Sequence, residues 1–208
     1  MDALFAKLRQ TTPESIESGE GYLIVGLGNP GREFKDTRHN IGFLTIDALA
    51  KTIDIKLSKV QNKAIIGLGK INGKKVVLAK PQTYMNLSGQ AVVGLLHFYK
   101  IPKENLIIIH DDIDLPFGTI RIRPKGGSAG QKGLDSTIDK LGSQDFARMR
   151  LGVGRPPGQM DAKDYVLQRF SKDQEEFLKA FLEKGCDAVK EFVANGLDAA
   201  MTRYNGII

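Results

Sequence analysis

The sequence predicts a single α/β domain built on a twisted, mixed β-sheet flanked by helices. Three observations support this fold class. Short continuous apolar runs, typical of buried strands, alternate along the chain with segments of helical apolar spacing. Neither an internal repeat nor an evident linker divides the sequence. Its 208 residues suit one ordinary domain, which we expect at residues 21–208, behind a polar N-terminal extension at residues 1–20.

The first predicted elements are a strand and a helix. The continuous apolar run Tyr22–Leu27 indicates a buried strand, and Gly28–Gly31 ends it in a tight turn. Apolar residues recur at helical spacing over residues 40–52, so we expect a helix there.

The next segment predicts a hairpin followed by a helix. Residues 64–68 and 75–79 have the composition of strands, and Asn72-Gly73 between them is a hairpin turn signal. Ser88 is a candidate N-cap for a helix that ends at Tyr99.

Three further strands are expected in the second half of the chain. Leu106–His110 is another continuous apolar run, which predicts a buried strand. Ile120–Arg123 and Arg148–Val153 alternate apolar and basic residues, so each is expected to be a strand with one solvated, positive face. Residues 131–141 form a short helix in this interpretation.

The C-terminal region predicts one long helix. Ser171–Gln174 has the sequence of a capping box, and apolar residues continue after it at helical spacing. Asn195-Gly196 is a signal for the end of that helix.

Composition excludes several classes of protein. With 41% hydrophobic and 26% charged residues, the chain is typical of globular proteins and unlike disordered or low-complexity chains. It has no apolar run near the roughly 20 residues that span a bilayer, and its start lacks the pattern of a secretory signal. The single cysteine, Cys186, can form neither an internal disulfide nor a cysteine metal cluster. We therefore expect a cytoplasmic protein without a membrane partner.

Positive charge is concentrated in one segment of the chain. The net charge is +6, and residues 120–155 contain eight Lys or Arg against three Asp, which leaves +5 there. A local excess of this kind favours a polyanionic partner, nucleic acid before membrane. A solvated basic face without a partner explains the same count equally well.

The string Gly26-Leu27-Gly28-Asn29-Pro30-Gly31 matches the dinucleotide fingerprint G-x-G-x-x-G. That fingerprint needs a helix that begins within it and offers free N–H groups to phosphate. Here Pro30 removes a donor, and helical spacing begins only near Ile41. A dinucleotide oxidoreductase therefore stays a minor hypothesis, and the alternative is a tight turn that presents the Asn29 side chain.

Two polar clusters are candidates for acid–base chemistry. His39 lies in a polar stretch before a helix, where it is either a hydrogen-bonding residue at the helix start or a general base. Asp111, Asp112 and Asp114 follow a predicted strand, at the edge where ligands gather in α/β sheets. These carboxylates could orient a histidine, bind a divalent cation or simply turn the chain. Of the two functional alternatives, cation binding is the weaker.

Two loops offer further polar groups. Asn86 precedes a predicted helix, where its amide either belongs to the cap or positions a water or carbonyl group. The glycine-rich loop at residues 125–133 could bring N–H groups close to phosphate. It is not a nucleotide-hydrolysing P-loop, because Lys132 follows Gln131 and Gly133 stands where Ser or Thr is required.

Four ordered motifs together make the sequence resemble the bacterial-type peptidyl-tRNA hydrolase family. The motifs are Leu23–Gly31, Thr37–Gly42, Thr83–Gly89 and His110–Pro116, and the resemblance runs from about Tyr22 to the end. Each motif is modest alone, but four in order are specific. The resemblance implies a monomeric esterase that uses neither metal nor cofactor and cleaves the ester between a peptide and the 3′-terminal ribose of tRNA.

The resemblance also implies roles for individual residues. His39 is the base that activates water, Asp111 holds and polarises it, and Asn29 and Asn86 position the peptide main chain and the water. Phe34, Tyr84 and Met85 line the pocket near the peptide or the terminal adenosine. Arg123 and Arg150 correspond to positions that clamp tRNA phosphate. Period-two spacing pairs Arg121 with Arg123 and Arg148 with Arg150, so adjoining strands would carry one arginine stripe.

One string of the chain departs from the family pattern. The family usually has a string like Gly-His-Asn-Gly, and this chain has Gly130-Gln131-Lys132-Gly133. Lys132 cannot accept a hydrogen bond as an asparagine does, but it can donate one to water or substrate, or meet phosphate. A catalytically impaired, hydrolase-like RNA-binding protein is therefore the alternative hypothesis.

Overall fold

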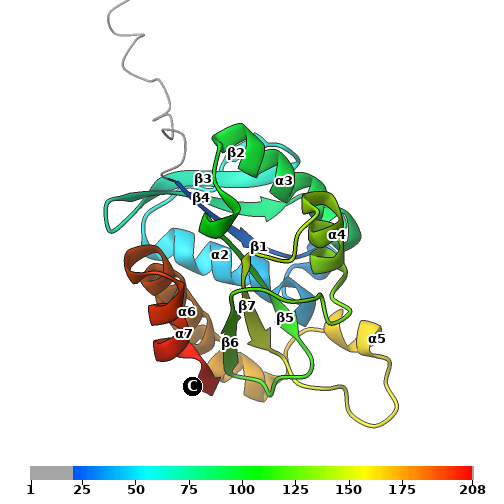
Figure 1. Cartoon of the computed structure of the whole chain (residues 1–208). Coiled ribbons are helices and arrows are strands. Elements are labelled where there is room, and N and C mark those ends of the chain that lie inside the picture. The colour runs from blue at the N-terminus through cyan, green and yellow to red at the C-terminus, as the bar shows by residue number, and fades with distance from the viewer. Residues whose placement is uncertain (1–20, 208) are drawn as a thin grey trace, which may run out of the picture.

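The computed structural model describes residues 21–207, so the predicted extension at residues 1–20 lies outside the described part of the chain. Within that part, one mixed sheet has the strand order β2-β3-β4-β1-β5-β7-β6-β8 (Figure 1). The strands are β1 (Tyr22–Gly26), β2 (Lys59–Gln61), β3 (Ala64–Ile71), β4 (Lys74–Pro81), β5 (Leu106–Asp112), β6 (Thr119–Arg123), β7 (Ala147–Gly152) and β8 (Gly206–Ile207). The centre of the sheet, β4-β1-β5-β7, is parallel, and the remaining strands join it in antiparallel pairs. The mixed α/β sheet of the prediction is confirmed.

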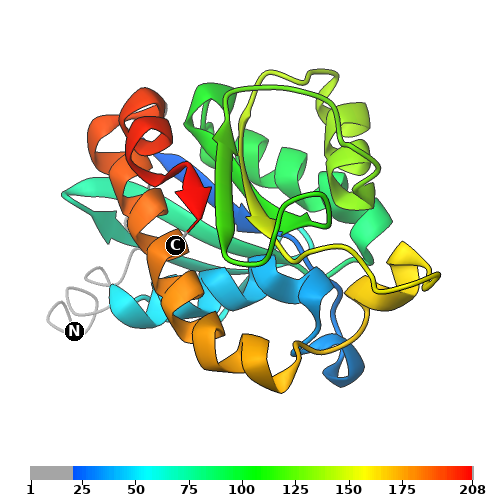
Figure 2. The ribbon, with the colours of Figure 1, turned by 90° about the horizontal axis from the view of Figure 1, so that it is seen from below.

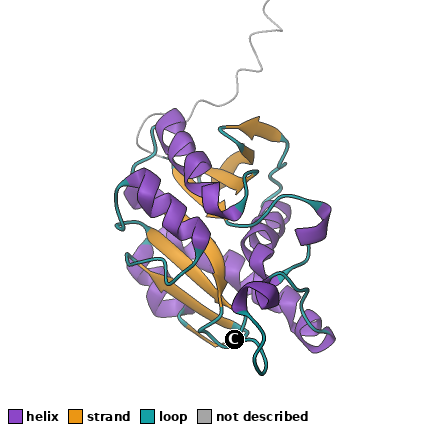
Figure 3. Cartoon of the chain, turned by 90° about the vertical axis from the view of Figure 1, so that its right-hand side faces the viewer, coloured by secondary structure: helices purple, strands orange, loops and turns teal. Residues whose placement is uncertain are grey.

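Helices cover both faces of the sheet (Figures 2 and 3). The α-helices are α2 (Ile41–Thr52), α3 (Ser88–Tyr99), α4 (Lys132–Leu141), α5 (Ala162–Val166), α6 (Lys172–Asn195) and α7 (Leu197–Tyr204). The short 3₁₀ helices are η2 (Arg32–Phe34), η3 (Arg38–Asn40), η4 (Met85–Leu87) and η5 (Lys103–Asn105). Helices α2, α6 and α7 pack on one face, and α3 and α4 pack on the other.

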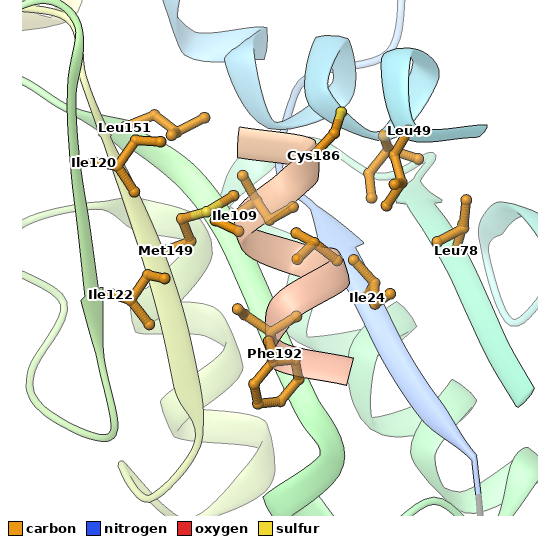
Figure 4. Close-up of a cluster of buried hydrophobic side chains, with 14 of the residues drawn as sticks. Ile24, Leu49, Leu78, Ile109, Ile120, Ile122, Met149, Leu151, Cys186 and Phe192 are labelled. Atoms are coloured by element: carbon orange, nitrogen blue, oxygen red, sulfur yellow. The ribbon is translucent and has the colours of Figure 1, made fainter. Parts of the chain in front are cut away.

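Strand β5 shows why the central strands have continuous apolar sequences. Its residues Ile107 and Ile109 join the core under α2 and α6, which Figure 4 shows with Ile109 labelled. Its residues Leu106 and Ile108 join the core under α3 and α4. Because alternate side chains of a strand point to opposite faces, a strand covered on both faces must be apolar throughout.

Two glycines let helix α2 approach the strands closely. A Cβ atom on Gly26 would lie 2.1 Å from the Gly42 carbonyl oxygen. A Cβ atom on Gly42 would lie 2.5 Å from backbone atoms of Leu27 and Ile109. Since real Cβ atoms do not come this close, both positions require glycine. The start of α2, and the 3₁₀ turn η3 before it, therefore stand over the carboxyl ends of β1 and β5.

Most predicted elements are present within a few residues of their expected bounds. The hairpin turn at Asn72-Gly73 joins antiparallel β3 and β4, and the capping box at Ser171 and Gln174 opens α6. Apart from the 3₁₀ helices, four elements of the described residues were not revealed by the sequence pattern: β2, α5, α7 and β8. They are two to eight residues long, too short for a clear periodic pattern.

Two local predictions are wrong. Ser88 does not cap α3, because η4 runs directly into the helix and makes Ser88 its first residue. Instead, the Ser136 hydroxyl of α4 accepts a hydrogen bond from the Gly89 N–H at 3.0 Å. Strand β5 also extends two residues beyond the predicted His110, so Asp111 and Asp112 belong to the strand and not to a loop after it.

Candidate active site

A cavity of about 600 Å³ opens at the carboxyl ends of β1 and β5. The 3₁₀ turns η3 and η4, the glycine-rich loop before α4 and helix α5 border it. The predicted site residues that line it are Asn29, His39, Tyr84, Met85, Asn86, Asp111 and Lys132. Residues from four separate sequence motifs therefore meet around one space.

His39 and Asp111 form a hydrogen-bonded pair in this cavity. His39 Nδ1 lies 2.8 Å from Asp111 Oδ2, and the side chains are 15% and 5% exposed. Because a carboxylate only accepts, Nδ1 carries the hydrogen and the other ring nitrogen, Nε2, is an acceptor in the neutral imidazole. The pair thus presents the tautomer that can take a proton through Nε2.

The Asp111 charge determines the pKa of His39. Burial disfavours the imidazolium ion and by itself lowers the pKa. The negative charge of Asp111 and its hydrogen bond to Nδ1 act in the opposite direction and together outweigh burial. As a result, the pKa of His39 is raised above its ordinary value of 6.5.

Arg38 anchors the turn that carries His39. Its buried guanidinium stacks on the Tyr165 ring at 4.1 Å and donates to the Arg169 carbonyl at 2.6 Å. A second nitrogen donates to Gln174 Oε1 at 2.9 Å. These contacts tie η3 to the segment between α5 and α6, so the position of His39 depends on the C-terminal part of the chain.

Hydrogen bonds hold both the side chain and the main chain of Asn29. Its Oδ1 accepts from the Met85 N–H at 2.8 Å. The Asn40 side chain accepts from the Asn29 N–H at 2.8 Å and donates to the Asn29 carbonyl at 2.9 Å. With Oδ1 engaged, the Asn29 amide has its Nδ2 end available as a donor. The sequence analysis did not identify Asn40 as a site residue. The signal that could have indicated it was the polar stretch Thr37–Asn40.

A second site residue that the sequence did not reveal is Gln131. Its side chain caps α4 and also donates to Asp111 Oδ1 at 3.2 Å. The signal that could have marked it is its place in Gly130-Gln131-Lys132-Gly133, where the family string has a histidine.

The three neighbouring aspartates have different partners. Asp111 contacts His39, Asp112 pairs with Arg150, and Asp114 pairs with the exposed Arg155. Within residues 21–207, no group of three or more His, Cys, Asp or Glu side chains is arranged to hold a metal ion. The contact between Asp111 and His39 is the geometry that a carboxylate orienting a histidine requires.

His110 is buried beside Asp111. Its Nδ1 donates to the Asp111 carbonyl oxygen at 2.7 Å. Burial lowers its pKa, and this outweighs the opposing influence of Asp111 and Asp112. Such contacts, together with its burial in β5, are typical of a structural histidine.

The predicted arginine stripe is present but incomplete. In the antiparallel β6–β7 pair, Arg121 lies opposite Arg150 and Arg123 opposite Arg148, so all four share one face. Arg148, however, is only 2% exposed and donates to the carbonyls of Gly126, Gly127, Gln144 and Phe146. The prediction of a solvated face is wrong for Arg148, because the glycine-rich loop covers that end of the stripe.

The remaining predicted residues differ in exposure. Tyr84 is 66% exposed at the cavity mouth, whereas Met85 is buried beneath it. Asn86 and Lys132 are exposed and line the cavity. Phe34 lies in η2 and is not part of the cavity wall, so the structure does not bring it to the other site residues.

The turn Gly28–Gly31 does not have the geometry of a dinucleotide site. The three-residue helix η2 follows it, and α2 begins only at Ile41. No long helix offers its N-terminus to a phosphate at this turn. In the same described part of the chain, residues 21–207, none of the helices has the length and apolar character needed to cross a bilayer.

Fold and site together define a class of protein. The chain is a mixed-sheet α/β protein whose cavity contains an imidazole oriented by a buried carboxylate, the arrangement of a general base. The family profile described as peptidyl-tRNA hydrolase matches residues 23–207.

Known proteins agree with this match. A peptidyl-tRNA hydrolase from Caldanaerobacter subterraneus subsp. tengcongensis is 48% identical over 89% of this chain and all of the relative. A chloroplastic one from Arabidopsis thaliana is 44% identical over 97% of this chain and 70% of the relative. The crystal structure of peptidyl-tRNA hydrolase from Acinetobacter baumannii superposes with a TM-score of 0.85 at 35% identity, covering 92% of this chain and 97% of that one. The chain belongs to the peptidyl-tRNA hydrolase family.

Proposed function

We propose that this hydrolase cleaves the ester bond between a peptide and the 3′-terminal ribose of tRNA, with water activated by His39 and Asp111. The contact between His39 Nδ1 and Asp111 Oδ2, at the wall of an open cavity, is the observation that carries this mechanism. The names of the relatives supply the substrate class.

The proton follows a closed path in this mechanism. Nε2 of neutral His39 takes a proton from water as the water oxygen bonds to the ester carbonyl carbon. When the carbon–oxygen bond to the ribose breaks, the imidazolium returns that proton to the 3′ oxygen. Asp111 stabilises the imidazolium in between, since its negative charge lies against Nδ1. The products are free tRNA and free peptide.

Asn29 and Asn86 supply neutral hydrogen-bonding groups. The Asn29 side-chain amide is held by the Met85 N–H and the Asn29 main chain by the Asn40 side chain, so the Nδ2 donor has a constant direction. An oriented donor can hold the peptide carbonyl or the attacking water without a reorganisation cost. Asn86 and Lys132 are exposed at the same cavity. Their side chains can bind water or substrate, and Lys132 can also bind a phosphate of the tRNA.

The arginines outside the cavity bind the tRNA backbone in this proposal. Arg121, Arg123 and Arg150 share one face of β6 and β7, and each is at least partly exposed. Phosphate contacts of this kind position the tRNA without reading its bases. We further propose that the protein acts as a monomer in the cytoplasm and without metal. The alternative, an impaired RNA-binding protein, is not favoured, because the relatives are named as hydrolases.

The test is hydrolysis of purified peptidyl-tRNA in the presence of EDTA. The wild-type protein should release peptide, and His39→Ala should reduce turnover by at least about 100-fold. His97→Ala is the matched control, because His97 is exposed on α3 and is not part of the cavity wall. Turnover by His39→Ala at the wild-type rate would contradict the mechanism, and loss of activity in EDTA would contradict the metal-free proposal.

A further inference from the structure

The Gln131 side chain connects helix α4 to the catalytic pair. Its Oε1 accepts hydrogen bonds from the N–H groups of Gly133 at 2.6 Å and Leu134 at 3.0 Å. Its Nε2 donates to Asp111 Oδ1 at 3.2 Å and contacts Met85 Sδ at 3.4 Å. One amide group therefore spans the helix start and the carboxylate that orients His39.

The direction of this amide is determined by its partners. The two backbone N–H groups can only donate, so the atom that faces them must be the oxygen. The nitrogen must then face Asp111, where a carboxylate oxygen can only accept. A Cβ atom on Gly133 would lie 3.0 Å from Gln131 Oε1 and 2.7 Å from Met85 Sδ, so glycine at that position leaves room for the arrangement.

Asp111 is held at both of its carboxylate oxygens. Oδ2 meets Nδ1 of His39 at 2.8 Å, and Oδ1 meets Nε2 of Gln131 at 3.2 Å. With only the first contact, the carboxylate could still turn about its terminal bond, a soft torsion. The second contact restricts that rotation and compensates a buried oxygen that would otherwise lack a partner.

We propose that Gln131 is a positioning residue for hydrolysis, which orients the Asp111 carboxylate and through it the His39 ring. This inference rests on the proposed His39–Asp111 mechanism. The competing role for Gln131 is that of a helix cap alone, which would affect the stability of α4 and not the chemistry.

Two substitutions retain a capping oxygen and change the contact with Asp111. Gln131→Asn keeps a strong N-cap residue but is one methylene shorter, so it cannot reach Asp111. Gln131→Glu keeps the side-chain length and an oxygen that can cap α4. Its second carboxylate oxygen takes the place of Nε2, so the N–H donor to Asp111 is lost. We expect Gln131→Asn to unfold near the wild-type temperature and Gln131→Glu to unfold at a lower temperature, because two neighbouring carboxylates repel each other. Both variants should lose about 10- to 100-fold in kcat per folded molecule, the usual effect of removing an orienting partner.

The pH profile separates the two variants. A second carboxylate beside Asp111 adds negative charge next to His39, which raises the pKa of His39 further. The acid limb of kcat/KM should therefore move to higher pH in Gln131→Glu, because the base must be neutral to act. The other titratable groups that border the cavity are the same in both variants: Tyr84, His110, Asp112, Asp114, Lys132 and Lys163.

Asn62→Ala provides the control for a loss of stability away from the site. The Asn62 side chain donates to the Gly94 carbonyl at 2.9 Å and does not line the cavity. This variant should lower the unfolding temperature and leave kcat per folded molecule unchanged. Wild-type kcat and pH profile in both Gln131 variants would overturn the inference, as would a loss of activity that only matches the unfolded fraction. If those variants are normal while His39→Ala is inactive, the proposed function stands and only the role of Gln131 fails.

Discussion

The imidazole of His39 and the carboxylate of Asp111 lie 2.8 Å apart although 72 positions separate them in the sequence. The 3₁₀ turn before α2 carries the first residue, and the end of β5 carries the second. Because the glycine contacts of α2 hold its start against β1 and β5, both residues of the pair lie on packed elements of the fold.

Asp111→Asn tests the charge of this pair. The substitution keeps the size of the side chain but removes the charge that raises the pKa of His39, while burial continues to lower it. We expect kcat to fall by about 100-fold or more. The acid limb of the kcat/KM profile, which reports the pKa of His39, should move to lower pH than in the wild-type protein, where this pKa lies above 6.5. An acid limb that stays at the wild-type pH would show that His39 is not the titrating base.

Arg121→Ala/Arg123→Ala tests the proposed tRNA-binding face. If these arginines bind phosphates, affinity for tRNA should fall as salt rises, because each such contact releases counterions. The double variant should raise KM, leave kcat unchanged and reduce the slope of log affinity against log salt by about one for each phosphate that is no longer bound. Lys172→Ala/Lys179→Ala on exposed positions of α6 is the charge-matched control. An unchanged slope in the arginine variant would exclude this face from tRNA binding.

Arg148→Ala is expected to behave differently from its neighbours on the same face. The Arg148 guanidinium is buried and donates to four carbonyl groups, so its removal leaves acceptors without partners. We expect the free energy of unfolding in urea to fall by about 2–3 kcal/mol, whereas the exposed Arg123→Ala should change it by less than about 0.5 kcal/mol. Equal stabilities of the two variants would contradict a structural role for Arg148.

Cys186 should be chemically inert in the native protein. The side chain is 2% exposed, and burial raises the pKa of its thiol to about 12, so little thiolate exists at neutral pH. A disulfide reagent at pH 8 should leave the folded protein unmodified and should modify one thiol per chain in urea. Rapid stoichiometric reaction of the native protein would show that the α6 packing opens readily.

The elements that the sequence located well are those with a strong local pattern. Continuous apolar runs marked β1 and β5, and a capping box with helical spacing marked α6, because strand burial and helix capping depend on neighbouring residues. Short elements such as β2 and α5 contain too few residues to show a period.

By itself, the sequence determined the α/β class, the order of the main strands and helices, and the polar residue types available for catalysis. Only the tertiary structure decided which arginine is buried, and that Asn40 and Gln131 support the site. The physical reason is that periodicity depends on adjacent residues, whereas hydrogen-bond partners depend on the order and register of strands. In this chain, that packing brings η3, the end of β5 and the start of α4 around one cavity.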